Sequence, residues 1–194
     1  NFNSKDSKKI KNPKNFLGGK GANLSEMGRM GLPVPPGFTI STKVCEIFYK
    51  DKKRLNKSLI SQIKKELKLI EKDVSKKFGD LKNPLLLSVR SGARVSMPGM
   101  MDTILNLGLN DKTVKALAIK TSNGRFAKDS YRRFIQMYGN VVMGVEGYHF
   151  EELIENYKLT KGVLLDTDLD ESDWDGLIED FKRTVREKAK KDFP

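Results

Sequence analysis

Apolar residues recur three and four positions apart over long stretches of this 194-residue chain, which is the spacing of amphipathic helices. The clearest stretch runs from Leu59 to Val74, where lysines occupy the opposite face. After Gly108 every segment follows the same spacing. It predicts helices at residues 111–121, 126–142, 149–157 and 173–190. The second half of the chain is therefore expected to be helical.

The first part of the chain is predicted to combine an arm, short helices and an extended connection. Residues 1–15 are expected to form an irregular or partly ordered arm. A short helix is predicted from Ala22, with Gly31 as its left-handed C-terminal cap. A second helix is expected to begin at residue 41 or 42, and its predicted core side consists of Val44, Ile47 and Phe48. Three prolines between residues 33 and 36 force an extended path between these helices.

Strands are predicted from short apolar runs. Residues 84–89 form a nearly continuous apolar run between turn residues, which is typical of a strand buried on both faces. Further strands are expected at 38–40 and 103–107. The predicted fold is α+β, with a small mixed sheet and helices in residues 1–110, followed by a helical subdomain in residues 111–194.

Composition places the chain among globular proteins. Hydrophobic residues make up 38% and charged residues 32% of the sequence, and no apolar run reaches the roughly 20 residues that a membrane-spanning helix needs. One cysteine and one histidine exclude an internal disulfide and a Cys/His metal site. We therefore expect a soluble cytoplasmic protein that has no membrane partner and no metal site in this chain.

The net charge of +12 raises the question of nucleic-acid binding. Residues 1–20 contain six lysines and one aspartate, whereas residues 51–78 contain nine lysines, one arginine and four acidic residues. These two segments carry 11 of the 12 net positive charges. Neither interleaves its lysines with the aromatic residues of a stacking platform, so a solvated lysine face is favoured and nucleic acid is disfavoured.

A glycine-rich turn, Gly18-Gly19-Lys20-Gly21, precedes the first predicted helix. Backbone N–H groups at a helix N-terminus attract anions, and Lys20 adds a full positive charge. The spacing differs from a Walker A motif, because Ala22 follows where a lysine and a hydroxyl residue would be needed. The alternative is a flexible turn with an exposed lysine.

Two arginines, Arg90 and Arg94, follow the apolar run at residues 84–89. Guanidinium groups at a rigid strand end match phosphate oxygens bidentately and stay charged at any working pH. Alternatively, Arg90 pairs with a carboxylate and holds two layers of the fold together. The loop after them combines methionines with a Pro-Gly turn, which fits either a lid over a ligand or a methionine-rich plug of the core. Its candidate lid residues are Ser96, Gly99, Met101, Asp102 and Thr103.

Other chemically interesting side chains are expected to be structural. His149 begins a predicted helix beside Phe150, and Cys45 is expected to be a buried or half-buried small hydrophobe. In the helix at 126–142, the residues assigned to the core recur at helical spacing and are Tyr131, Phe134, Ile135 and Tyr138. The arginines Arg125, Arg132 and Arg133 are assigned to the solvated face of that helix. No catalytic residue is assigned in this chain.

Three stretches together closely resemble the nucleotide-binding part of the pyruvate, phosphate dikinase family. They are residues 17–24, LGGKGANL, residues 32–38, LPVPPGF, and the unbroken run from Ser88 through the segment SMPGMMDT to Asn110. Residues 125–143 resemble the helical insertion of the same family. The SMPGMMDT segment separates this family from phosphoenolpyruvate synthase, which shares the Ser-Val-Arg-Ser opening without that loop.

The resemblance implies the first part of an ATP-grasp fold that supplies ATP. Full-length members convert ATP, phosphate and pyruvate into AMP, diphosphate and phosphoenolpyruvate, and they carry the phosphoryl group on a histidine of a separate domain. Lys20 corresponds to the family's phosphate-contacting lysine, and Arg90 and Arg94 to its ATP-binding arginines. Mg²⁺ ligands, the adenine pocket, the phosphohistidine domain and the pyruvate-binding domain have no counterpart here. The parent enzyme is expected to be a homo-oligomer.

We therefore expect a fragment that folds and does not catalyse alone. Two alternatives remain open on the sequence. One is a dikinase of the phosphoenolpyruvate synthase type, and the other is a basic nucleic-acid or anion-binding module without catalysis.

Overall fold

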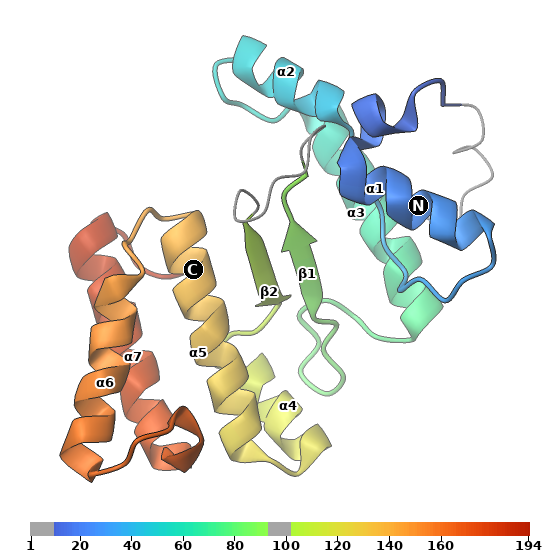
Figure 1. Ribbon diagram of the computed structural model, residues 1–194. Helices are drawn as coiled ribbons and strands as arrows, with labels where there is room; N and C mark the ends of the chain where they lie inside the picture. The colour runs from blue at the N-terminus through green and yellow to red at the C-terminus, as the bar shows by residue number, and fades with distance from the viewer. Residues whose placement is uncertain (1–9, 93–101) are drawn as a thin grey trace. The chain divides into compact units, whose positions relative to one another are not determined.

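The computed structural model describes residues 10–92 and 102–194 and has an α+β fold (Figure 1). Within these residues a two-stranded sheet accompanies seven α-helices. In chain order the elements are α1 (Pro13–Arg29), α2 (Thr42–Lys50), α3 (Lys57–Val74), β1 (Leu87–Arg90), β2 (Thr103–Leu107), α4 (Thr113–Thr121), α5 (Gly124–Val141), α6 (Tyr148–Lys161) and α7 (Glu171–Ala189). A single 3₁₀ turn, Asp166–Asp168, precedes α7. The predicted small sheet with helices is confirmed at this level.

The chain divides into two compact units. The first unit comprises Asn1–Ser75 and Arg90–Asp102, and the second comprises Lys76–Val89 and Thr103–Pro194. The division expected near residue 110 concerned functional domains and stays a prediction.

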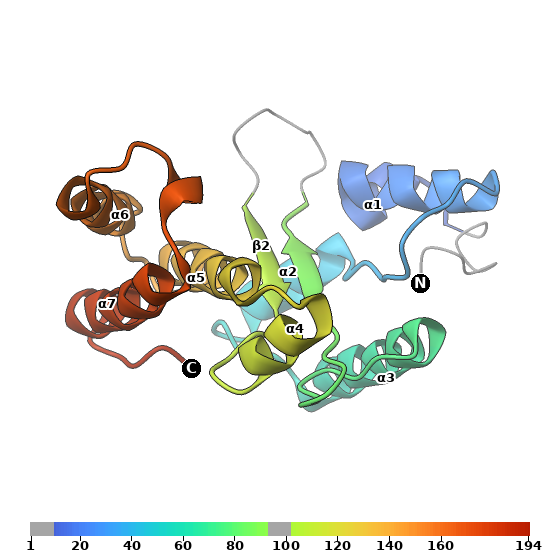
Figure 2. The ribbon, with the colours of Figure 1, turned by 90° about the horizontal axis from the view of Figure 1, so that it is seen from below.

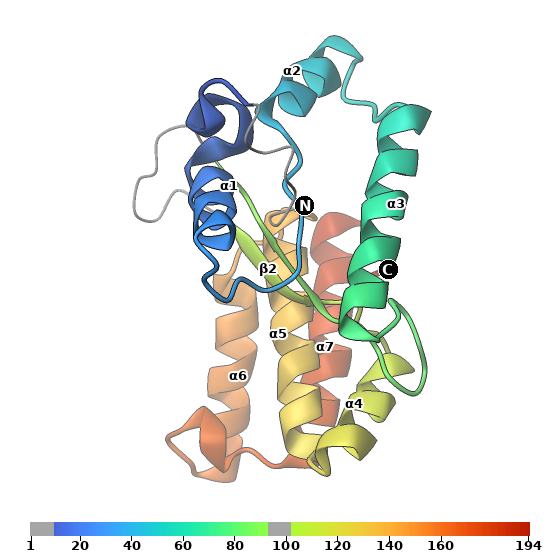
Figure 3. The same ribbon diagram turned by 90° about the vertical axis from the view of Figure 1, so that its right-hand side faces the viewer.

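Helix α5 is the centre of the second unit. It packs against α7, α4 and strand β2, while α6 packs against α7. Figures 2 and 3 show α5, α6 and α7 running alongside one another, with α4 against the start of α5. All four helices predicted after Gly108 are confirmed, with their ends shifted by at most four residues.

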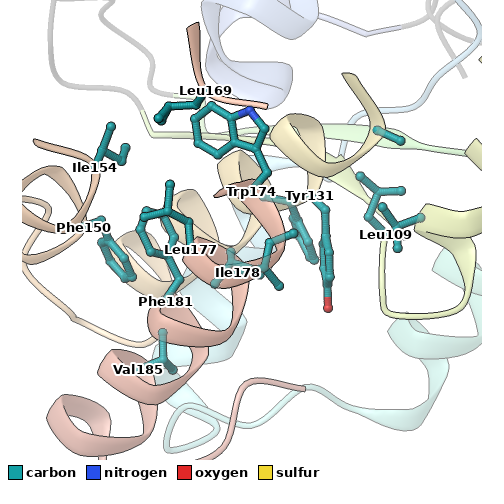
Figure 4. Packing of buried hydrophobic residues seen from close by; sticks show 14 of the residues in the cluster. Leu109, Tyr131, Phe150, Ile154, Leu169, Trp174, Leu177, Ile178, Phe181 and Val185 are labelled. Atoms are coloured by element: carbon teal, nitrogen blue, oxygen red, sulfur yellow. The ribbon is translucent and has the colours of Figure 1, made fainter. Parts of the chain in front are cut away.

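The apolar faces of these helices enclose one hydrophobic core (Figure 4). Trp174, Phe150 and Phe181 are the largest fully buried side chains there. Burial of each such side chain stabilises the fold by about 1.5–3 kcal/mol before entropy is counted. The second unit therefore has a core of its own.

Asp170 caps the N-terminus of helix α7, and neighbouring groups stabilise its negative charge. The Asp170 carboxylate accepts hydrogen bonds from the backbone N–H groups of Ser172 (2.8 Å) and Asp173 (3.1 Å). The Lys161 ammonium lies 2.6 Å from it. This ammonium, followed by the backbone donors, lowers the pKa of Asp170 to about 2. Because the folded pKa lies below the unfolded value near 3.9, this contribution exists above pH 4 and disappears as the pH falls toward 2.

We therefore expect Asp170→Asn to reduce the acid sensitivity of the second unit. Asparagine still caps a helix but does not titrate, so its melting temperature falls less between pH 4 and pH 2 than that of the unmodified chain. Thermal unfolding followed by far-UV circular dichroism measures this. Glu152→Gln, which changes an exposed acid without an ion pair in the described chain, should behave like the unmodified protein. Parallel losses in Asp170→Asn and the unmodified chain would contradict the assignment.

The first unit has a much smaller core. Among its described residues, Ile70 is the only buried residue of α3, and α2 has none. Helix α1 packs on α2, where the Thr42 hydroxyl donates to the carbonyl oxygen of Asn15 at 2.7 Å. The core side predicted for α2 is wrong at Ile47, which is 43% exposed, whereas Val44 and Phe48 are half-buried. Cys45 is also exposed, contrary to the expected burial.

Two of the three strand predictions required correction. Residues 38–40 form no strand, and the Thr39 side chain instead approaches the backbone of α1 at Gly21. The apolar run at 84–89 was expected to be buried on both faces, yet β1 begins at Leu87 and its Val89 is 48% exposed. A sheet of two strands has too few neighbours to cover both faces. Strand β2 is confirmed at its predicted residues.

Candidate functional site

The glycine-rich segment lies inside helix α1, not before a helix as predicted. Helical structure begins at Pro13, so the irregular arm expected at residues 1–15 is wrong for residues 13–15, and residues 1–9 lie outside the described residues. The helix is broken at Gly18, whose φ of 72° and ψ of 167° are accessible essentially to glycine alone. Lys20 therefore lies in the first turn of the segment that restarts after this break. A restarted segment directs backbone N–H groups toward its beginning, which suits an anion.

Gly21 has a packing role that the sequence did not reveal. A Cβ at this position would come within 2.9 Å of the Thr39 side chain and 3.2 Å of the Leu17 Cβ. The missing side chain thus lets the segment at Thr39 lie directly against α1. Lys20, on the same turn, is half-buried, and its side chain has no ion pair or hydrogen bond to any described residue.

Arg90 ends strand β1 and is exposed. The next residue, Ser91, donates its backbone N–H (3.0 Å) and its hydroxyl (3.2 Å) to the carbonyl oxygen of Asp102. These bonds hold together the two ends of the loop that joins the strands. No carboxylate among the described residues pairs with Arg90, so the alternative of a structural ion pair gains no support there.

Only part of the predicted lid falls within the described chain. Asp102 is exposed beside Ser91, and Thr103 is half-buried at the start of β2. The remaining predicted site residues, Arg94, Ser96, Gly99 and Met101, lie outside the described residues. The structure thus brings Arg90, Ser91, Asp102 and Thr103 together at one loop and places Lys20 on another element.

A buried charged cluster in the second unit was missed from the sequence. Arg132 was assigned to a solvated face, but it is 5% exposed and its guanidinium lies 4.7 Å from the centre of the Trp174 ring. Its Nε donates to Asp129 at 2.9 Å, and its Nη2 lies 3.5 Å from Asp166. Burial lowers the pKa of Arg132, and the Asp129 carboxylate opposes that shift.

Arg125 was also misassigned to solvent. It donates to the backbone carbonyl oxygens of Leu169 and Asp166, each at 2.7 Å. Arg133, the third member of the predicted face, is indeed 57% exposed in its side chain. Arg125 and Arg132 thus join α5 to the segment before α7, which is a structural role and not a binding site.

A second polar contact joins α7 to the start of α4. The Lys182 ammonium lies 2.6 Å from the Asp111 carboxylate, to which the Tyr131 hydroxyl donates at 3.1 Å. Burial, followed by the Asp111 charge, raises the pKa of Tyr131, so this phenol stays protonated. His149 stacks on Tyr148 with 4.0 Å between ring centres, as expected of a structural side chain.

The described residues contain neither a metal-binding cluster nor a membrane-spanning helix. Residues 10–92 and 102–194 contain no group of three or more His, Cys, Asp or Glu side chains that could hold a metal ion. None of the helices described there combines the length and the apolarity needed to cross a bilayer.

Comparison with known proteins shows similarity to one family of enzymes. Residues 14–65, which include Lys20, match the family model described as pyruvate phosphate dikinase, AMP/ATP-binding domain. The chain is 54% identical over 184 residues to the chloroplastic pyruvate, phosphate dikinase of Mesembryanthemum crystallinum, covering 95% of this chain and 19% of that protein. The enzymes of Clostridium symbiosum (54% over 174 residues) and Entamoeba histolytica (51% over 181) cover 90% and 93% of this chain and 20% of their own lengths.

The similarity thus includes, over residues 14–65, a nucleotide-binding domain of the dikinases. The chain is a relative of the pyruvate, phosphate dikinases over nearly all of its length. It spans about a fifth of the length of these curated relatives. The resemblance noted from its motifs is thus confirmed.

Proposed function

We propose that this chain binds the phosphate groups of ATP for a pyruvate, phosphate dikinase. In that reaction ATP, phosphate and pyruvate become AMP, diphosphate and phosphoenolpyruvate, by way of a histidine on a separate part of the enzyme. The observation that carries the proposal is the identity of 51–54% to such enzymes. The match to their AMP/ATP-binding domain extends across the glycine-rich segment.

The proposed binding groups are Lys20, Arg90 and Arg94. The broken helix supports Lys20, because a cation beside free N–H groups neutralises phosphate oxygens. The position of Arg90 at a strand end, without a carboxylate partner in the described chain, supports a guanidinium available for a ligand. Catalysis of phosphoryl transfer depends mainly on such positioning and on neutralisation of the negative charge of the phosphate groups.

The loop from Ser96 to Thr103 is proposed to cover the bound phosphates. Excluding water there would prevent hydrolysis of ATP in place of transfer. The hydrogen bonds from Ser91 to Asp102 support this idea, because they hold the base of the loop.

The wider arrangement is proposed from the relatives. The chain would form the first part of an ATP-grasp fold, with a helical subdomain from residue 111. The ligands of Mg²⁺ are proposed to lie in other parts of the parent enzyme.

Lys20→Gln is expected to weaken binding of ATP to the 194-residue chain about tenfold, since a hydrogen bond to a charged group contributes about 1.5–3 kcal/mol. Isothermal titration calorimetry with ATP measures this. Lys14→Gln is the matched control, because Lys14 is an exposed lysine on the same helix before the break at Gly18. Equal affinities of Lys20→Gln and the unmodified chain would remove Lys20 from the proposal, and absence of ATP binding by the unmodified chain would refute binding by this chain alone.

A further inference from the structure

A hollow of about 370 Å³ lies at the junction of α2 and α3, on residues that the proposed function does not use. Its size is within the range of small-ligand sites. It includes the last residue of α2, the connection and the cap of α3. We call it the α2–α3 hollow, and its lining residues are Lys50, Asp51, Lys52, Arg54, Leu55 and Asn56.

Three of the six residues that line the α2–α3 hollow are cationic. Lys50, Lys52 and Arg54 line it, and Asp51 is the single acidic residue of the lining. All of these side chains are exposed, and none of the three cations forms an ion pair with another residue of the described chain. Cations gathered without carboxylate partners repel one another, and a bound anion would relieve that repulsion.

The connection that carries these cations has a defined backbone. Lys52 and Lys53 both have left-handed φ values, 51° and 60°. The N–H of Lys53 donates to the carbonyl oxygen of Phe48 at 2.8 Å, and the N–H of Arg54 donates to that of Asp51 at 3.1 Å. These bonds fix the backbone of the turn, so the Cα positions of Lys52 and Arg54 are set before any ligand arrives.

We propose that the α2–α3 hollow binds a small molecule that carries two or more phosphate groups. Several negative charges within a compact volume match three cations around one hollow, and the guanidinium of Arg54 can hold phosphate oxygens bidentately. An extended nucleic acid fits less well. Along α3 the lysines are interspersed with Glu66, Glu71 and Asp73. Positive charge is therefore not continuous along this helix.

The proposal is tested with inorganic triphosphate as the probe and the 194-residue chain as the protein. Lys52→Gln/Arg54→Gln should lower the affinity at least tenfold at about 50 mM salt, where screening is weak. The control Lys64→Gln/Lys68→Gln removes the same charge from exposed positions of α3 and should change the affinity less than twofold. Lys52→Arg/Arg54→Lys keeps the charges and should keep measurable binding, which guards against a loss caused by misfolding.

Four results would overturn this proposal. Absence of triphosphate binding by the unmodified chain would do so, and equal losses in the two glutamine pairs would mean diffuse attraction with no defined site. Loss of binding in Lys20→Gln alone would place the triphosphate on the glycine-rich segment. A short DNA duplex that binds the chain, is weakened by Lys64→Gln/Lys68→Gln and is not displaced by triphosphate would favour a nucleic-acid surface on α3 instead.

Discussion

Arg90→Ala, in a full-length pyruvate, phosphate dikinase carrying this sequence, is expected to slow phosphoryl transfer from ATP to the enzyme at least 100-fold. Removing a preorganised donor from a developing negative charge commonly has this effect. Exchange between pyruvate and phosphoenolpyruvate should continue, because that half-reaction does not use the phosphates of ATP. Isotope exchange measured separately for the two half-reactions gives both rates.

The controls for this prediction use other arginine substitutions. Arg90→Lys keeps the positive charge but loses the planar fork, so its rate should fall between those of Arg90→Ala and the unmodified enzyme. Arg133→Ala removes an exposed arginine of α5 and should leave both half-reactions unchanged. The role of Arg90 would be refuted if both half-reactions survived Arg90→Ala unchanged. Loss of both would point to a folding defect.

Trp174→Ala is expected to destabilise the second unit by about 3–5 kcal/mol, as large-to-small changes of aromatic core residues do. Trp174 is completely buried in the hydrophobic core (Figure 4). Its ring lies over the guanidinium of Arg132, 4.7 Å from the ring centre. Truncation would leave a cavity and remove the ring face over a buried cation. Urea unfolding followed by far-UV circular dichroism measures the loss, since the chain has one tryptophan and the variant has none to report fluorescence.

The variant Trp174→Phe separates the effect of packing from the effect of the unsatisfied indole N–H donor. The indole Nε1 is buried and has no hydrogen-bond partner among the described residues. Phenylalanine keeps an aromatic face and removes this unsatisfied donor, so the expected cost is about 1–2 kcal/mol, mainly from the smaller volume. A cost for Trp174→Phe as large as for Trp174→Ala would contradict this account of the site.

The helices could be predicted because their signals are local. The spacing of apolar residues from Leu59 to Val74 and throughout α5 and α7 depends only on the 3.6-residue period of a helix. The strand predictions depended on neighbours that the sequence does not name. Residues 38–40 have a composition suited to a strand but form no strand in the described chain. Residues 84–89 have the composition of a strand buried on both faces, although the two-stranded sheet leaves Val89 exposed.

The candidate site, like the fold, could be predicted in part from the sequence. The sequence singled out Lys20 and Arg90 from charge, glycine content and position, and the structure adds the broken helix at Gly18 and the closed loop base at Ser91. The close approach of Thr39 to Gly21 could not be predicted, because it joins segments 18 residues apart whose side chains carry no mutual signal.

Arg132 shows most clearly which features the sequence determines and which only the tertiary structure decides. The sequence by itself determined that α5 is a helix with Tyr131, Phe134 and Ile135 in the core. It placed Arg132 outside that stripe, since successive residues turn by about 100° around a helix. Only the packing of α7 and of the segment before it set Trp174 and Asp166 beside the guanidinium and buried it. Helical period is a property of neighbouring residues, whereas the burial of a flanking charge depends on which distant side chains cover it.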